Sequence, residues 1–412
     1  MRGGGIKLQT TRNNPPTAHL LDLTRTARRA GLRPTGIDRI EHAYLREFLT
    51  CDTRLFGIVR TRIGYLLLDR SGCETLLDHC ERAIWTKADL LSRVTRRAAP
   101  SIAVTESGLR RSALDRSTPI RLRHMLTKHI PQGAVYFNLG QTNYNDRMIH
   151  ALRACDDLRT VVYLHDTIPL DWPDTQTQAA CLKFKRFFEK ADRHADIVLC
   201  NSGQTADRIS AHATHLDKAA IHVLSPGLPD MTLGIAPTGP WTGKPYFLAI
   251  GTIEPRKQIG FLLDLWDGFA GPNAPHLLIC GRRGWLSEDV FTRLDQKPEN
   301  VHELSDLSDD AMWALLKGSN GLLFPSISEG FGYPAIEAAH LNVPLICNPL
   351  PVFREILGNY PIYAAESDRY VWTNKIEQLA QRRRGQSGEQ SRSGGFTAPL
   401  WQDHFQRLFT LL

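Results

Sequence analysis

A glycine-rich turn within residues 321–341 has the residue types of a phosphate-binding site. Residues 321–324 are apolar and predict a buried strand, and Pro334 predicts the first turn of a helix, where the N–H that proline lacks is not needed. Gly330 and Gly332 lie between the two elements and would leave backbone N–H groups open beside the positive end of the helix dipole. Such a turn suits a phosphate or a diphosphate.

Two glutamates accompany this turn. Glu329 lies in the turn itself, and Glu337 follows eight positions later on the predicted helix. Ionised carboxylates only accept hydrogen bonds, so this pair could hold hydroxyl groups of a sugar and of a ribose. The turn and the two acids together favour a sugar nucleotide. An ordinary strand–helix unit with solvent-facing glutamates would show the same spacing. The glutamate pair alone therefore does not distinguish a sugar-nucleotide site from such a unit.

A second turn, earlier in the chain, carries two cations. The apolar run 246–250 predicts a strand, and Gly251 follows it directly. Arg256 and Lys257 come next and could meet a diphosphate at the carboxyl end of that strand. Taken alone, an Arg–Lys pair is also a common surface feature.

The segment PSISEGFGYPAIEA resembles the E-x7-E signature of the retaining family-four glycosyltransferases, also called group 1. Tyr333 stands in this predicted donor site where the family more often has an aliphatic residue. By the resemblance, Glu329 would hold hydroxyls of the donor sugar and Glu337 those of the ribose. Glycine lets the main chain approach a ligand closely. Three residues would wrap the sugar and the diphosphate with their backbone: Gly330, Phe331 and Gly332.

The segment GTIEPRKQ resembles the same family's G-x-x-x-x-R-K motif, whose basic pair binds the donor diphosphate. Gly251 would line this site, and Arg256 and Lys257 would stabilise the charge that grows on the leaving diphosphate, a task for side chains and amides where no metal takes part. Arg282, after the next predicted strand, could contact phosphate or base, or simply lie exposed in its loop. The resemblance is nearly continuous over residues 246–352.

In the first half of the chain, His165 and Asp166 lie at the end of an apolar run, where ligands bind in α/β sheets. A lone histidine at a strand end is more often structural. His–Asp followed by a proline nevertheless resembles the family's first-domain motif, in which the histidine faces the donor sugar. His165 would then position the sugar or handle a proton, as a catalytic residue beside Glu329 and the cation pair. Asp166 is assigned to the acceptor side.

Residues 35–39, TGIDR, open a predicted helix near the N-terminus. The family has a glycine-bearing loop here that approaches donor and acceptor, and this version is longer and more basic. Gly36, Asp38 and Arg39 are therefore candidates for the acceptor side. Asp38 and Arg39 could equally cap and solvate the helix.

The composition is that of a folded protein: 412 residues, enough for two domains, with 42% hydrophobic and 23% charged side chains. No stretch approaches the ~20 apolar residues that span a bilayer, and residues 1–16 lack the apolar region of a signal peptide. Eight cysteines without a C-x-x-C pair indicate a reducing compartment, so we expect a cytoplasmic protein. The sequence has no D-x-D and no zinc-ligand spacing, and we expect no metal and no bound cofactor.

The net charge of +7 is concentrated in one region. Residues 82–128 hold eleven basic and three acidic side chains. This region could be a solvated face, or it could attract an anionic membrane or a phosphate-bearing acceptor. The second interpretation predicts peripheral contact with the inner face of the membrane. We expect no nucleic acid partner, because Trp85 is the only aromatic residue there and no binding module is recognisable.

Short apolar runs alternate with amphipathic stretches, which predicts an α/β fold with parallel sheets. The boundary between two halves falls in the Pro- and Gly-rich stretch 225–245. We expect two Rossmann-like domains facing each other across a cleft, the GT-B fold: 1–235 on the acceptor side and 236–395 for the donor. Residues 381–398 predict a loose loop, and 396–412 predict a helix that, by the resemblance, crosses back to the first domain. The predicted strands are 19–23, 56–59, 64–68, 135–138, 160–165, 197–201, 220–224, 246–250, 276–280, 321–324 and 344–347.

The residues and the resemblance together predict a hexosyltransferase, and the resemblance implies that it is a retaining one. It would move a sugar from a GDP- or UDP-linked donor to a glycan or lipid-linked acceptor in surface polysaccharide synthesis. The alternatives are a sugar-nucleotide epimerase or phosphorylase-like enzyme of the same architecture, and a non-catalytic protein that binds sugar nucleotides.

Overall fold

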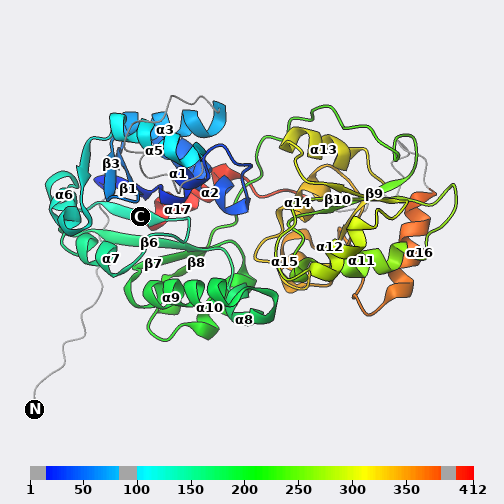
Figure 1. Cartoon of the computed structure of the whole chain (residues 1–412). Coiled ribbons are helices and arrows are strands. Elements are labelled where there is room, and N and C mark those ends of the chain that lie inside the picture. Colours follow the sequence, from blue (N-terminus) through cyan, green and yellow to red (C-terminus); the bar gives the residue numbers. More distant parts are fainter. Residues whose placement is uncertain (1–14, 83–99, 382–395) are drawn as a thin grey trace, which may run out of the picture.

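The computed structural model describes residues 15–82, 100–381 and 396–412. Within them the chain forms two α/β lobes, each built on its own sheet (Figure 1). The first sheet has eight strands in the order β4-β3-β2-β1-β5-β6-β7-β8, and the second has six in the order β11-β10-β9-β12-β13-β14. The predicted α/β class with two sheet-based halves is confirmed.

The first sheet is covered by helices on both faces (Figure 1). Its strands are β1 (Ala18–Asp22), β2 (Arg54–Arg60), β3 (Tyr65–Leu68), β4 (Asp115–Ser117), β5 (Val135–Asn138), β6 (Arg159–Leu164), β7 (Ile197–Cys200) and β8 (Ile221–Val223). Its helices are α1 (Thr24–Arg29), α2 (Gly36–Thr50), α3 (Arg70–Arg82), α5 (Pro100–Ser112), α6 (Leu122–His129), α7 (Asp146–Leu152), α8 (Ile168–Asp171), α9 (Gln178–His194) and α10 (Gly203–His212).

The second sheet is parallel throughout, and its central strands are buried along their whole length. Burial on both faces explains why β9 and β12 are continuous apolar runs. The strands are β9 (Tyr246–Ile250), β10 (His276–Cys280), β11 (Val301–Leu304), β12 (Gly321–Phe324), β13 (Leu345–Cys347) and β14 (Ile362–Tyr363). The helices are α11 (Ile259–Trp266), α12 (Glu288–Asp295), α13 (Asp309–Lys317), α14 (Tyr333–His340), α15 (Pro351–Leu357) and α16 (Arg369–Ala380).

All eleven predicted strands are present, with bounds that differ by two residues at most. One expectation was wrong: the first sheet is not parallel at its edge, because β3 runs antiparallel to β2 and β4 runs antiparallel to β3. Only residues 61–64 join β2 to β3, which is too short for the crossover that parallel strands need. The strand predictions also omitted β4 and β14. β4 (DRS) and β14 (two residues) contain no apolar run of strand length.

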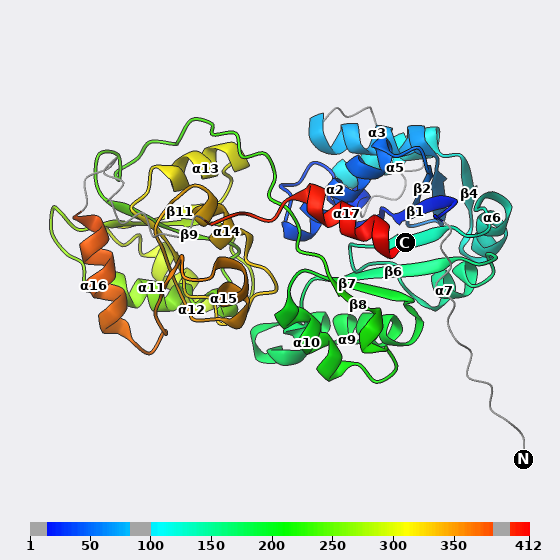
Figure 2. The ribbon, with the colours of Figure 1, turned by 180° about the vertical axis from the view of Figure 1, so that it is seen from behind.

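The last helix, α17 (Trp401–Leu411), leaves the second lobe and lies on the first (Figure 2). Phe405 and Leu408 are buried in the first lobe's core, and His404 bonds Tyr44 through its Nε2 at 2.8 Å. The chain thus crosses between the lobes twice. The loop predicted over 381–398 falls mostly outside the described residues, as do residues 1–14. In the part of the chain that the structure describes, no helix has the length and apolarity to cross a bilayer.

Candidate active site

The carboxyl ends of β9 and β12 bring the two predicted turns together. These strands are parallel neighbours, so the segments that follow them leave the sheet at the same edge. After β9 comes a 3-10 turn, η4 (Pro255–Lys257), and after β12 comes the glycine turn. Glu329 Oε1 lies 2.6 Å from Lys257 Nζ and 2.7 Å from an Arg256 nitrogen. Residues 72 positions apart therefore form one buried cluster.

The cluster contains equal numbers of acids and bases. Arg256 also bonds Glu254 Oε1 at 2.5 Å and the Ser328 carbonyl at 2.7 Å. Burial alone would raise the pKa of Glu329, but the two adjacent cations outweigh it and hold that pKa below its usual value. Lys257 Nζ lies 4.4 Å from the centre of the Phe324 ring, and its stem lies against Gly251. Glu329 is consequently an ionised acceptor, and two cations stand at the same edge of the sheet.

The glycine turn depends on its two glycines for different reasons. Gly332 has φ +83°, a left-handed conformation, and a Cβ there would lie 2.6 Å from the Phe353 ring. Gly330 allows close approach of the lobes: a Cβ on it would lie 2.1 Å from the His165 carbonyl oxygen. Among the described hydrogen bonds, none uses the backbone N–H of residues 330–332. These amides lie directly before α14, where an anion is favoured.

The first lobe brings His165 over this turn. The Asn201 side chain donates to the His165 carbonyl at 2.7 Å, and Ser202 Oγ donates to the Gly330 carbonyl at 3.0 Å. The His165 ring donates through Nε2 to the Leu139 carbonyl at 2.7 Å. Burial lowers the pKa of His165 to about 4, so the imidazole is neutral near pH 7 and Nδ1 is its acceptor. Burial raises the pKa of Asp166, next along the chain, against the effect of Arg256.

The three acceptor-side candidates on α2 occupy different environments. Gly36 packs against the Tyr333 ring: a Cβ added to Gly36 would lie 3.2 Å from Cδ2 of Tyr333. Asp38 caps α2 through Thr35 and pairs with the arginines of α1. Arg39 reaches across to the second lobe and bonds Glu337 Oε1 at 2.5 Å. Glu337, the predicted ribose carboxylate, therefore pairs with a first-lobe cation.

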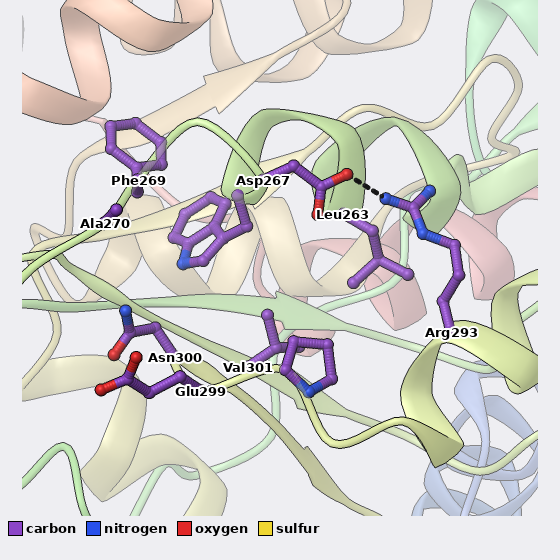
Figure 3. A pocket seen from close by; sticks show the side chains of 10 residues that line it. Leu263, Asp267, Phe269, Ala270, Arg293, Glu299, Asn300 and Val301 are labelled. Atoms are coloured by element: carbon purple, nitrogen blue, oxygen red, sulfur yellow. Dashed lines mark hydrogen bonds and ion pairs between the residues drawn. The ribbon is translucent and has the colours of Figure 1, made fainter.

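Arg282 is separate from these groups. Its side chain is 61% exposed and pairs with Asp306 at 3.0 Å. A pocket of about 120 Å³ in the second lobe also lies elsewhere, between the end of α11 and the start of β11 (Figure 3). Its rim carries Asp267 and Arg293, which bond each other at 2.9 Å. Since β11 begins there, this pocket is at the opposite edge of the sheet from the Glu329 cluster.

Two further residues belong to the site and were not among the sequence candidates. Glu254, 5% exposed, completes the charge cluster; its position two residues before Arg256 was a usable signal. Asp309 pairs with Arg39 at 2.9 Å and with Arg33 at 2.9 Å. It begins α13, and nothing in the local sequence distinguishes it from an acid that favours the helix N-terminus.

The model of the family Glycosyl transferases group 1 matches residues 235–387, which contain the Glu329 cluster and the glycine turn. This part of the chain is therefore similar to the group 1 glycosyltransferases. The match covers the second sheet and its helices. The first lobe, with His165 and Arg39, lies outside it.

Curated relatives agree with the family. The serotype-specific mannosyltransferase WbdA of Escherichia coli is 29% identical over 225 residues, 48% of this chain and 27% of WbdA. The O-antigen chain mannosyltransferase RfbU of Salmonella typhimurium is 31% identical over 141 residues, 33% of this chain and 38% of RfbU. The matched parts thus span less than half the length of either relative.

Solved structures show the same fold. The structure of HepE from Anabaena in complex with UDP-glucose superposes with a TM-score of 0.58 at 15% identity, covering 96% of each chain. TarM of S. aureus gives a TM-score of 0.52 at 15% identity, covering 75% of this chain and 60% of TarM. The two sheet-based lobes are those of the GT-B glycosyltransferase fold.

Proposed function

We propose that this protein is a retaining, metal-independent glycosyltransferase of surface polysaccharide synthesis, with residues 1–235 on the acceptor side and 236–395 holding the donor. It transfers a sugar from a nucleoside-diphosphate sugar to a glycan or lipid-linked acceptor. The observation that carries this proposal is the Arg256–Lys257–Glu329 cluster beside the glycine turn, within a group 1 domain. Cations and amides at one sheet edge suit a diphosphate, and an ionised carboxylate suits sugar hydroxyls.

In the proposed reaction the bond between the sugar's anomeric carbon and the diphosphate oxygen breaks, and the acceptor hydroxyl oxygen bonds to that carbon from the same face. The hydroxyl proton passes to the departing diphosphate. Arg256 and Lys257 stabilise the negative charge on that leaving group. Glu329 orients the sugar hydroxyls, and neutral His165 orients the sugar from the first lobe. Contact between the lobes excludes water that would otherwise hydrolyse the donor.

For the donor sugar we propose mannose, because the curated relatives are named mannosyltransferases. The base is guanine or uracil. The proposal is tested by incubating the protein with GDP-mannose, UDP-glucose and other GDP- and UDP-sugars, with mannose-terminated oligosaccharides as acceptors. Release of nucleoside diphosphate together with an α-linked product supports it. Epimerised donor, phosphorolysis or tight binding without turnover would instead identify the epimerase, phosphorylase-like or non-catalytic alternative.

We also propose that the first lobe contacts an anionic membrane through two adjacent loops. Ile120 is 92% exposed and Ile63 is 52% exposed. The loops that carry Ile63 and Ile120 lie side by side, because Tyr65 pairs with Ser117. Four exposed arginines lie close to these isoleucines in the sequence: Arg60, Arg62, Arg121 and Arg123. Isoleucines among arginines match a surface of anionic headgroups over acyl chains. Lys87, Arg93, Arg96 and Arg97 of the basic region lie outside the described residues.

Ile120→Asp is expected to weaken binding to vesicles of phosphatidylglycerol and phosphatidylcholine about tenfold, because it removes an apolar contact and adds repulsion. Co-sedimentation at low salt measures this. The matched control is Ile235→Asp, since Ile235 is 91% exposed but lies in the segment between the sheets. Equal binding by both variants, or equal binding to purely zwitterionic vesicles, would contradict this membrane contact.

A further inference from the structure

Arg39 of the first lobe forms an ion pair with Glu337 of the second lobe. Its guanidinium bonds Glu337 Oε1 at 2.5 Å and Asp309 Oδ2 at 2.9 Å. It also lies 5.5 Å from the centre of the Tyr333 ring and 5.8 Å from that of Trp313. The Glu337 side chain is only 2% exposed. Arg39 is thus held by two carboxylates and two aromatic rings of the second lobe, and Asp309 and Glu337 are 270 and 298 positions away along the chain.

Arg39 approaches Glu337 from the first lobe, and a donor held between the lobes would approach it from the same side. A ribose whose hydroxyls bond Glu337 would need the space that the guanidinium takes. We infer that Arg39 and the ribose of the nucleotide compete for Glu337, so that the donor displaces Arg39 when it binds. The inference rests on the proposed function, because it takes Glu337 as the ribose carboxylate.

The same exchange would couple donor binding to the positions of the lobes. Asp309 accepts from both Arg39 and Arg33, so two first-lobe cations end on one second-lobe acid. Arg33 does not bond Glu337 and can keep its pair with Asp309 when Arg39 leaves. Arg39 therefore occupies Glu337 until the nucleotide displaces it, whereas Arg33 only links the lobes through Asp309.

The inference predicts that Arg39→Ala tightens the binding of nucleoside diphosphate. While the Arg39–Glu337 pair is formed, only a minor fraction of the molecules can bind the nucleotide, and the apparent affinity is reduced by that fraction. Removing the pair should therefore lower Kd about three- to tenfold. Isothermal titration calorimetry with UDP and GDP measures this on the full chain. Arg39→Met, which keeps an unbranched apolar stem against Tyr333 and Trp313, should give the same gain. It serves as the second variant if alanine destabilises the fold.

Arg33→Ala is the matched control, because it breaks a pair between the lobes without freeing Glu337; its Kd should stay within about twofold of wild type. Weaker binding by both Arg39 variants would overturn the inference and make Arg39 a direct ligand of the nucleotide. Unchanged binding would overturn it too. Failure of the proposed function is a separate result: neither UDP nor GDP binds the wild type, or Glu337→Ala leaves their affinity unchanged.

Discussion

Lys257→Met is expected to lower the rate of sugar transfer about a hundred- to a thousandfold while the protein stays folded. In the proposed reaction the substitution removes one of the two cations that stabilise the leaving diphosphate, and a single preorganised charge-stabilising group is worth about that factor. Methionine retains an unbranched apolar stem beside Gly251. Glu329 keeps its bond to Arg256 at 2.7 Å, so no buried carboxylate is left unpaired. Initial rates with the nucleotide sugar that the wild type uses measure the loss of transfer. Thermal unfolding measures whether the variant stays folded.

The control for this prediction is Lys375→Met. Lys375 is a half-buried lysine of α16 in the same lobe, and its Nζ donates to Gln378 Oε1 at 3.0 Å in an exposed hydrogen bond. The same substitution there should leave the rate within about twofold, as surface changes away from special features usually do. A Lys257→Met protein as active as Lys375→Met would remove the diphosphate role from Lys257. A protein that no longer unfolds cooperatively would show that the cluster is needed for folding, and Arg256→Lys would then be the variant to assay.

The second lobe was predictable because its signals are local. β9, β10 and β12 are apolar runs bounded by glycine or by polar residues, and burial on both faces requires such runs. The two site turns follow these strands directly. Parallel strands then place Lys257 and Glu329 at one edge, whichever order the sheet adopts. A prediction made from single segments could therefore name the Arg256–Lys257–Glu329 cluster.

The contacts between the lobes were not predictable in the same way. Arg39 was a candidate for the acceptor side, but the structure pairs it with Glu337, because two lobes folded from distant parts of the chain meet there. Asp38 was open between acceptor contact and helix cap. The structure shows it in a capping box with Thr35, and it also pairs with Arg25 and Arg29 of α1, which the spacing did not indicate. Arg282 follows a strand just as Arg256 does, yet it points to solvent. Spacing along the chain does not encode such pairings.

Gly330→Ala is expected to reduce transfer about a hundredfold without unfolding either lobe. A Cβ on residue 330 would lie 2.1 Å from the His165 carbonyl and 3.0 Å from the Asp166 Cβ, both in the other lobe. The clash is relieved by parting the lobes, and a displacement of about 1 Å at a reacting centre can cost this factor. Small-angle scattering should show a larger radius of gyration, while the unfolding temperature changes by only a few degrees.

Gly260→Ala separates this effect from the general cost of replacing a glycine. Gly260 is in α11 of the same lobe, and its Cβ would meet only Val290 Cγ2 at 3.5 Å, an ordinary contact. Alanine favours the helix there by about 1 kcal/mol, so this variant should be active and no less stable than wild type. If Gly330→Ala transferred sugar as fast as Gly260→Ala, close contact at His165 would be unnecessary for the reaction. Catalysis would then depend on the second lobe's cluster without the histidine above it.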